Sequence, residues 1–254
     1  MSELRFDGCT VIVTGAGRGL GRAYAELLSK RGASLVVNDI DADVAAVTAA
    51  ALPGAVAASA DVSMSDGAAS VVDAALTAFG RVDAVVANAG TSSHVMFDDM
   101  DGDDLEAALS TNLWSTFHIV RAVWPHLAES GRGRVVTTAS GAVFGFVGRA
   151  HYAAAKGGVL ALTNTLAIEG AAHGIHVNCV LPQGHTRLAR PGSNAPDASL
   201  AAPPLVWLCH ETCIENGSAF SIGGGRIARV RLTQGTWVDV DGTTPEAYRD
   251  ALTL

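Results

Sequence analysis

Tyr152 and Lys156 are the residues whose types and spacing are best suited to chemistry, because the lysine follows the tyrosine by four residues. The three alanines between them favour a helix, and residues four apart in a helix lie on the same side. A lysine ammonium beside a phenol stabilises the phenolate, which lowers the tyrosine pKa from its ordinary value of about 10. A tyrosine tuned in this way can donate or accept a proton near neutral pH. Such pairs also occur on helices without any catalytic role, so the interpretation depends on the rest of the chain.

A glycine-rich segment near the N-terminus supports the catalytic interpretation of this pair. The apolar run from Cys9 to Val13 is typical of a buried strand, and it leads through residues 14–21 into a helical stretch from Arg22 to Lys30. Strand, glycine turn and helix together are the context of a dinucleotide-binding fingerprint. The glycines let the backbone approach a pyrophosphate, whose charge the helix N-terminus stabilises. The residues expected to hold the cofactor here are Gly15, Arg18, Gly19, Leu20 and Gly21.

Asp39 indicates which dinucleotide is bound. It follows a second predicted strand, Ser34 to Asn38, and lies eighteen residues after Gly21. A carboxylate at this place accepts hydrogen bonds from both hydroxyls of the adenosine ribose and repels a 2′-phosphate. The sequence therefore predicts NAD, with its reduced form NADH, as the cofactor.

In chain order, these motifs resemble those of the short-chain dehydrogenase/reductase family, from about Leu4 to Gly225. The family's cofactor pattern Thr-Gly-x-x-x-Gly-x-Gly is matched from Thr14 to Gly21. Its adenine-pocket Asp-Val, its Asn-Ala-Gly turn and its Pro-Gly turn have counterparts further along the chain. The resemblance adds to the cofactor site Asp61, Val62, Asn88, Ala89, Gly90, Pro182, Gly184 and Thr186, together with Tyr152 and Lys156.

The resemblance also implies a catalytic tetrad of Asn112, Ser140, Tyr152 and Lys156. Tyr152 would give a proton to a carbonyl oxygen during reduction or take one from an alcohol during oxidation. Lys156 would lower the Tyr152 pKa and bind the nicotinamide ribose. Ser140 would hold the substrate oxygen, and Asn112 would hold a water that links Lys156 to solvent. The hydride chemistry belongs to the nicotinamide.

Two departures from the family pattern concern spacing. The serine and the tyrosine of the family are usually thirteen residues apart, whereas Ser140 and Tyr152 are twelve apart. The residue thirteen positions before Tyr152 is Ala139, which has no hydroxyl. We therefore interpret the shorter interval as a one-residue deletion in the loop 141–148. The Pro-Gly turn is here Pro182-Gln183-Gly184, which leaves the register of the following residues open.

Softer motifs resemble the (3R)-hydroxyacyl-CoA dehydrogenase modules of peroxisomal multifunctional enzyme type 2 and their bacterial one-domain relatives. They are Leu205–Glu211, Ser221–Arg226 and Thr243–Glu246. This branch implies NAD as the cofactor and a 3-hydroxyacyl thioester or a hydroxysteroid as the substrate.

Arg18 resembles the arginine with which other relatives bind the 2′-phosphate of NADP. Because Asp39 would place a negative charge near that phosphate, we expect Arg18 to face solvent or to pair with a carboxylate.

The order of elements predicts one α/β domain over residues 1–254. Apolar strands alternate with helices, which favours a Rossmann-type, doubly wound parallel sheet of about seven strands with helices on both faces. Two long helices are expected at Asp103–Glu129 and His151–His173, a short substrate lid near 186–204, and a C-terminal tail at 226–254. The predicted strands are Cys9–Val13, Ser34–Asn38, Ala55–Ala58, Val82–Ala87, Arg134–Thr138, His176–Val180 and Ala219–Ile222.

Composition and charge argue against several classes of binding partner. The net charge of −8 argues against nucleic acid, which requires basic patches, and no uncharged apolar run is long enough for a membrane span. The four cysteines show no disulfide framework, and Cys209 and Cys213 lack a second ligand pair, so we expect no metal. We expect a cytoplasmic protein that acts on a small alcohol or ketone. The family resemblance implies a homotetramer or homodimer joined by the two long helices.

Two alternatives differ from an NAD-dependent alcohol dehydrogenase or ketone reductase. An NADPH-dependent 3-oxoacyl thioester reductase would share the tetrad, but Asp39 argues against it. A non-catalytic module that senses NAD would have no need of the Tyr152–Lys156 pair.

Overall fold

A computed structural model describes residues 3–184 and 194–252 of the chain, and one eight-stranded sheet organises it. The strand order is β3-β2-β1-β4-β5-β6-β7-β8, in which the first seven strands are parallel and β8 is antiparallel to β7. The doubly wound parallel sheet is therefore confirmed. The strands are β1 Thr10–Val13, β2 Ser34–Asp39, β3 Ala55–Ser59, β4 Ala84–Ala87, β5 Arg134–Thr138, β6 His176–Pro182, β7 Ala219–Gly223 and β8 Arg226–Val230.

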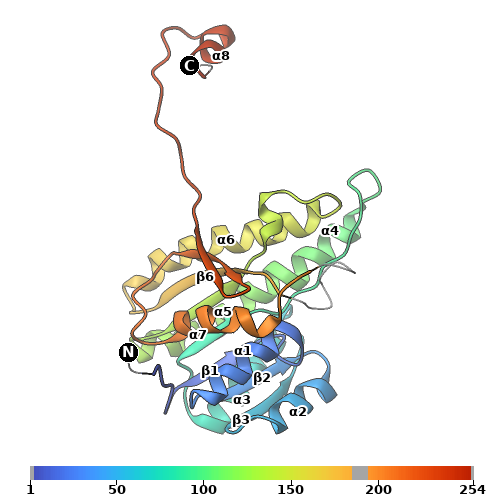
Figure 1. Cartoon of the computed structure of the whole chain (residues 1–254), viewed down its shortest axis with the longest axis vertical. Coiled ribbons are helices and arrows are strands. Elements are labelled where there is room, and N and C mark those ends of the chain that lie inside the picture. The colour runs from blue at the N-terminus through green and yellow to red at the C-terminus, as the bar shows by residue number, and fades with distance from the viewer. Residues whose placement is uncertain (1–2, 185–193, 253–254) are drawn as a thin grey trace.

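Helices cover both faces of the sheet (Figure 1). One apolar core lies between the sheet and α1, α2 and α7, and a second lies between the opposite face and α3 and α5. The central strands β1 and β4 are buried along their whole length, as their runs of valine, isoleucine and alanine require. The helices are α1 Gly19–Lys30, α2 Ala42–Ala50, α3 Ser65–Phe79, α4 Gly102–Leu109, α5 Ser115–Ser130, α6 Ala150–Ala171, α7 Ala202–Cys209 and α8 Pro245–Leu252. None of the helices in these ranges is long and apolar enough to cross a membrane.

The first of the two predicted long helices is interrupted. Between α4 and α5 the residues Ser110–Trp114 form one wider π-helical turn, η1. The side-chain amide of Asn112 donates a hydrogen bond to the carbonyl of Ala108 over 3.0 Å, four residues back. Wide turns of this kind are frequent at functional sites, and this one carries a residue of the predicted tetrad.

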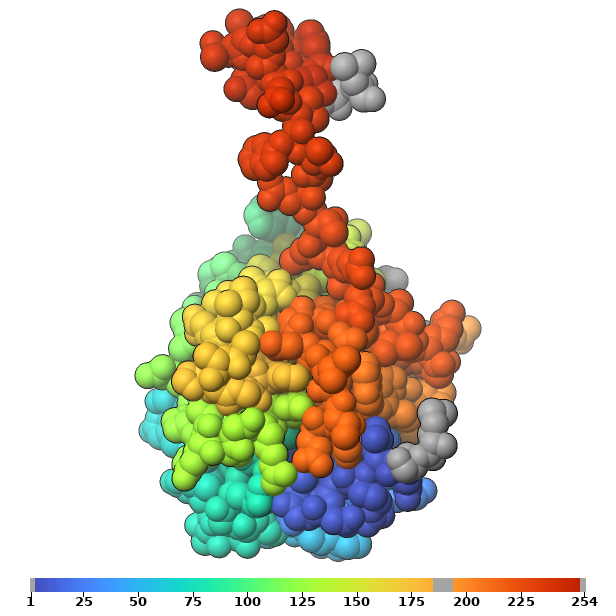
Figure 2. All heavy atoms as spheres, turned by 90° about the vertical axis from the view of Figure 1, so that its left-hand side faces the viewer, coloured from blue at the N-terminus to red at the C-terminus, as the bar shows by residue number. Residues whose placement is uncertain are grey.

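The segment predicted as a tail begins with a strand. Gly224 and Gly225 turn the chain with φ of 56° and 72°, a backbone region that favours glycine, and β8 then pairs with β7. Beyond β8 the chain runs away from the body of the molecule to α8 (Figures 1 and 2). The prediction of about seven strands was thus one short.

Only part of the predicted lid, 186–204, can be placed, since residues 186–193 and with them Thr186 lie outside the described ranges. In the described part, Ala198–Ala201 form a 3₁₀ turn, η3, and α7 begins at Ala202. Pro203 and Pro204 occupy the first turn of α7, where a missing N–H costs nothing. The end of the predicted lid, from Ala202 to Pro204, therefore belongs to a helix.

Candidate active site

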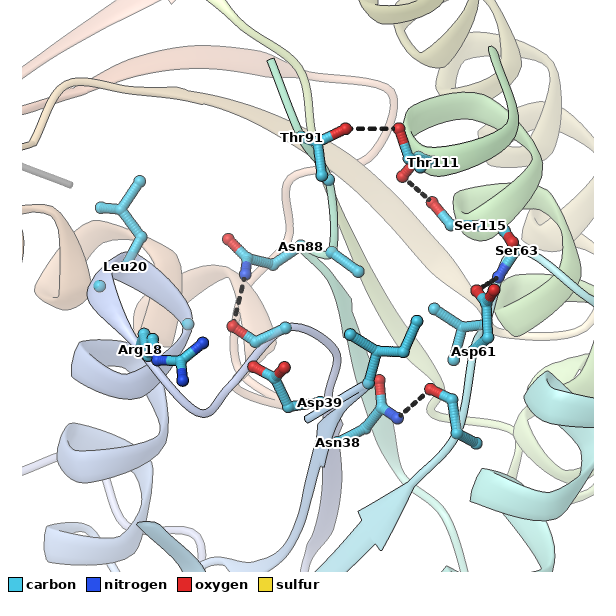
Figure 3. Close-up of a pocket in the computed structure, with 18 of the residues that line it drawn as sticks. Arg18, Leu20, Asn38, Asp39, Asp61, Ser63, Asn88, Thr91, Thr111 and Ser115 are labelled. Carbon is cyan, nitrogen blue, oxygen red and sulfur yellow. Dashed lines mark hydrogen bonds between the residues drawn. The ribbon is translucent and has the colours of Figure 1, made fainter. Parts of the chain in front are cut away.

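A cavity of about 530 Å³ lies at the carboxyl ends of the strands, where the strand order reverses between β1 and β4 (Figure 3). Open α/β sheets bind their ligands at this place. Eleven predicted cofactor residues line it: Gly15, Arg18, Gly19, Leu20, Gly21, Asp39, Asp61, Val62, Asn88, Ala89 and Gly90. Eight residues that the sequence motifs did not predict line it too: Asn38, Ile40, Ala60, Ser63, Thr91, Ser92, Thr111 and Ser115.

The glycine turn forms one wall of the cavity because its backbone comes close to the loop after β4. Gly15 and Gly19 have φ of 60° and 54°, and α1 begins at Gly19 with no acidic residue in its first turn. A Cβ on Gly21 would clash with the carbonyl of Gly15 and would lie 2.7 Å from the side-chain nitrogen of Asn88. The turn therefore leaves backbone N–H groups of a helix N-terminus open to an anion, which suits the pyrophosphate of a dinucleotide.

Asp39 ends β2 and lines the cavity (Figure 3). Two backbone groups hold its carboxylate. The N–H of Gly17 donates to Oδ2 over 3.1 Å, and the N–H of Asp41 donates to Oδ1 over 3.2 Å. Arg18 forms an ion pair with Asp41 at 2.7 Å rather than with Asp39. The expectation that Arg18 pairs with a carboxylate is confirmed, and Asp39 keeps acceptor capacity for a ligand.

Thr14 joins the glycine turn to the Asn-Ala-Gly turn. Its hydroxyl oxygen accepts hydrogen bonds from the backbone N–H groups of Asn88 and Ala89, each over 3.0 Å. The side-chain amide of Asn88 donates to the carbonyl of Thr14 over 2.9 Å. These bonds hold the two turns together and fix the cavity wall beside Gly90.

The adenine end of the predicted site is held in a similar way. Asn38 donates its side-chain N–H groups to the carbonyls of Ala58 and Ala60, which binds β2 to the strand end that carries Asp61. The carboxylate of Asp61 accepts from the N–H of Ser63 over 2.9 Å, and Val62 is buried beside it. Both residues that the family motif predicted therefore lie at one end of the cavity.

Tyr152 and Lys156 lie on α6, and both are nearly inaccessible to solvent, with exposed fractions of 8% and 3%. The lysine Nζ donates to the carbonyl of Thr138 over 2.8 Å and lies 5.9 Å from the centre of the Tyr152 ring. Ser140 contributes a side-chain hydrogen bond to Tyr152, and its own oxygen accepts from the N–H of Ala142 over 3.2 Å. The structure therefore brings three members of the predicted tetrad together.

The pKa of Tyr152 does not move in the direction that the sequence predicted. Burial raises it above its ordinary value, and hydrogen bonding by Ser140 and the charge of Arg149 only partly oppose this. Burial lowers the pKa of Lys156 to about 8, because the low-dielectric interior disfavours the ammonium. The prediction assumed a lysine that contacts the phenol, whereas this ammonium bonds to Thr138.

Asn112 has an unused acceptor next to Lys156. Its amide nitrogen donates to the carbonyls of Thr91 and Ala108, while its Oδ1 is buried without a partner among the described residues. A Cβ built on Gly90 would lie 2.5 Å from this oxygen and 3.3 Å from the Lys156 Nζ. Both atoms therefore border the same small space at the end of the cavity, and a bound water there would satisfy the orphaned oxygen.

Of the other predicted cofactor residues that the structure describes, none is in the lining of this cavity; they are Tyr152, Lys156, Pro182 and Gly184. Pro182 ends β6, and Gly184 packs against Leu20, since a Cβ there would lie 3.1 Å from the leucine side chain. Thr186 lies outside the described residues. The cavity residues that sequence reasoning missed mostly adjoin a motif that it found, as Ile40 adjoins Asp39 and Thr91 adjoins Gly90.

Cysteine and histidine residues form no metal centre in the part of the chain that the structure covers. No group of three or more His, Cys, Asp or Glu there could hold an ion. Cys209 and Cys213 are buried free thiols, and Cys213 uses its carbonyl to accept a hydrogen bond from Arg134.

Comparisons with known proteins agree with this geometry. The profile of the short chain dehydrogenase family matches residues 9–190. The chain is 38% identical over 269 residues to peroxisomal multifunctional enzyme type 2 of Mus musculus, with 98% of this chain and 37% of that protein covered. It thus spans little more than a third of that relative. It is also 38% identical over 242 residues to a putative short-chain type dehydrogenase/reductase of Mycobacterium tuberculosis, with 87% and 84% covered.

Two solved structures share the fold. A short chain dehydrogenase from Mycobacterium avium has a TM-score of 0.86 and 31% identity, with 98% of this chain and 96% of that chain covered. A 3-ketoacyl-(acyl-carrier-protein) reductase from Brucella melitensis, complexed with NADH, has a TM-score of 0.81 and 29% identity, with 87% and 99% covered.

Proposed function

Because this chain belongs to the short-chain dehydrogenase/reductase family, whose members bind a nicotinamide cofactor and act on CH–OH groups, we propose that it interconverts a secondary alcohol and a ketone with NAD as its cofactor. One observation carries the proposal. The cavity has the Asp39 carboxylate in its lining, and at Gly90 it borders the ammonium of Lys156 beside Tyr152. A dinucleotide with its ribose at Asp39 would reach the acid–base pair with its nicotinamide. The bound cofactor supplies or accepts the hydride.

The chain's own residues handle the proton and the substrate oxygen. Tyr152 gives its hydroxyl proton to the oxygen of a ketone, or takes the proton from an alcohol when the reaction runs in reverse. Ser140 holds the same oxygen through its hydroxyl, which is pre-organised where charge develops. Lys156, with a pKa of about 8, exchanges a proton near neutral pH, and the free Oδ1 of Asn112 positions a water that connects it to solvent.

The preference for NAD is supported by the charge in the lining of the cavity. Asp39 offers a carboxylate to the ribose hydroxyls, and Arg18 is already neutralised by Asp41. A 2′-phosphate would therefore meet a carboxylate without a free guanidinium to offset it. This disfavours the NADPH-dependent 3-oxoacyl thioester reductase, although that activity stays the second candidate because one structural relative is a 3-ketoacyl reductase.

A 3-hydroxyacyl thioester or a bulky ring alcohol such as a hydroxysteroid is the substrate class we propose. Support comes from the similarity to peroxisomal multifunctional enzyme type 2, whose (3R)-hydroxyacyl-CoA dehydrogenase modules the segments Leu205–Glu211, Ser221–Arg226 and Thr243–Glu246 resemble. We further propose one domain over residues 1–254, a homotetramer or homodimer joined through α5 and α6, and a cytoplasmic location. A non-catalytic NAD sensor is disfavoured because Tyr152 and Lys156 are both present.

Replacement of Asp39 by alanine tests the cofactor assignment. We expect Asp39→Ala to weaken NAD binding and to reduce the preference for NAD over NADP about ten- to a hundredfold, because a charge-assisted hydrogen-bond acceptor and a repulsive charge are both lost. Dissociation constants of NADH and NADPH, measured by fluorescence titration, check this. Asp43→Ala on the outside of α2 is the control. An unchanged ratio of the two constants in Asp39→Ala would refute the assignment.

The activity itself is tested on the intact chain. NADH and NADPH binding is measured first, and reduced-cofactor absorbance is then followed with secondary alcohols, hydroxysteroids and 3-hydroxyacyl-CoA thioesters. NADH preference together with turnover of one class supports the proposal and identifies the substrate family. Tight NADH binding without turnover across the whole panel would favour the sensor instead.

A further inference from the structure

Arg149 is a half-buried arginine beside the proposed acid–base residue. It immediately precedes α6, three residues before Tyr152. Its guanidinium carbon lies 5.4 Å from the centre of the Phe146 ring and 5.9 Å from the centre of the Tyr152 ring. Its charge reaches the phenol, because it is one of the two influences that oppose the burial of Tyr152. A small substrate bound at Tyr152 could therefore also contact the Arg149 guanidinium.

Nothing in the described part of the chain neutralises this cation. Arg149 takes part in none of the ion pairs there, and its Nε is buried without a hydrogen-bond partner. Among the described residues, the other arginines that are at least half-buried differ in this respect, since Arg31 pairs with Glu3 and Arg134 donates to five backbone carbonyls. Residues 185–193 contain no Asp or Glu, so that segment has no side-chain carboxylate to offer.

The surroundings of Arg149 add to the positive potential. α6 has 22 residues, and its N-terminus carries no acidic residue in the first turn and no side-chain cap. The aligned peptide dipoles therefore place partial positive charge at the same point. In the loop after β4, Asp98 and Asp99 are exposed and form no ion pair with Arg149. An uncompensated cation at a helix N-terminus favours an anion.

Two loops with exposed apolar side chains meet beside this cation. The N–H of Val95 donates to the carbonyl of Gly148 over 2.9 Å, which joins the loop after β4 to the loop before α6. The exposed apolar side chains of these loops are Met96, Phe97, Phe144, Phe146 and Val147. Apolar groups of this size in water are characteristic of a surface that a ligand covers.

We propose that Arg149 binds a carboxylate of the substrate, so that among the proposed 3-hydroxyacyl thioesters and ring alcohols the preferred members carry a carboxylate and an apolar body near the reacting carbon. This assignment rests on the proposed function, because it places the substrate's oxygen at Tyr152. A planar guanidinium with open N–H donors matches a carboxylate in two parallel hydrogen bonds. The apolar side chains on the two loops then cover the rest of the molecule.

The test compares two probes of one shape that differ in charge. Phenylacetate and phenylacetamide are titrated calorimetrically into the full chain, with and without NADH. We expect phenylacetate to bind about ten- to a hundredfold more tightly than the amide, which is the range of a charge-assisted hydrogen bond. Arg149→Gln should remove this preference, and Arg149→Lys should retain part of it. Arg121→Gln removes an exposed arginine of α5 that forms no ion pair in the described chain, and it should keep the preference in full.

Each outcome is decisive because binding is measured without turnover. The proposal is overturned if the wild type shows no preference for the anion, if Arg149→Gln keeps it, or if that variant weakens both probes equally. Anion binding through Arg149 in a protein that turns over no alcohol would support an anion site at Arg149 but refute the proposed function, and with it the role of that site in binding an alcohol substrate. Turnover of neutral substrates without any anion preference would do the reverse.

Discussion

Tyr152→Phe is expected to lower kcat by about a thousandfold while cofactor binding stays within about twofold of the wild type. Removal of one positioned acid–base group typically costs two to four orders of magnitude. The phenyl ring fills the same space on α6, so the packing around Lys156 is kept. Single-turnover absorbance of NADH and fluorescence titration of the same preparation measure the two effects.

Tyr24→Phe is the matched control for this variant. The hydroxyl of Tyr24 is fully buried in the core on α1 and has no hydrogen-bond partner among the described residues. Its removal should leave both activity and stability intact. If Tyr152→Phe retained the turnover of the wild type, the hydroxyl of Tyr152 would not transfer the proton.

The pH dependence of the wild type follows from the burial of Tyr152. Alcohol oxidation requires the phenolate, and burial holds the pKa of the free chain above the ordinary tyrosine value. The kcat/KM for oxidation should therefore rise with pH across the neutral range, whereas ketone reduction, which uses the neutral phenol, should not. Bound cofactor brings further charge close to Tyr152 and would shift this profile. The pKa of Tyr152 is therefore compared between the free chain and the chain with bound cofactor.

Lys156→Met is expected to lower turnover by about a hundredfold or more and, unlike most losses of function, to stabilise the protein. The folded pKa of Lys156 is about 8, against 10.5 for an ordinary lysine. At neutral pH the folded chain thus buries an ammonium at a cost of about 3 kcal/mol. The variant removes this cost and loses one hydrogen bond to Thr138, worth about 1 kcal/mol, so a net gain of about 1–2 kcal/mol remains.

The sign can be checked by the pH dependence of unfolding. Between pH 8 and 10.5 the unfolded chain holds a proton on Lys156 that the folded chain has lost, so the contribution of Lys156 to stability rises with pH in this window. Burial raises the pKa of the four cysteines, whose contribution falls with pH there, so the wild type is compared with the variant. Below pH 8 the full penalty is present. Denaturant unfolding of Lys156→Met should lack this rise, and Lys30→Met, which changes the only other lysine, should keep it. A stability difference between the wild type and Lys156→Met that stays constant over this window would contradict a buried, destabilised ammonium.

The fold and most of the cofactor cavity could be predicted from sequence because their signals are local. Apolar runs such as 9–13 correspond to buried strands, and the glycine pattern and Asp39 stand next to the strands that position them. β8 was missed because its five residues are exposed or nearly so, and the two arginines give the segment no apolar alternation. The π-helical turn was missed because one wider turn does not change the composition of a helix.

Electrostatics at the site could not be predicted from spacing alone. The four-residue interval between Tyr152 and Lys156 sets a shared helix face, but it does not decide where the ammonium points. In the fold the ammonium turns to a backbone carbonyl of β5, and Arg149 becomes the cation that affects the phenol. Arg149 itself belongs to no motif, and its lack of a partner is a property of the three-dimensional arrangement.

The antiparallel strand β8 also decides how the sheet ends. Without it the last strand would be β7, a short parallel strand whose free N–H and C=O groups could template further strands and promote aggregation. β8 covers that edge and presents Arg226 at the new border, whereas the charge of Arg229 is paired with Glu215. Repulsion between two copies of Arg226 then opposes the pairing of two such borders, so the residues after Gly225 protect the sheet against edge-to-edge self-assembly.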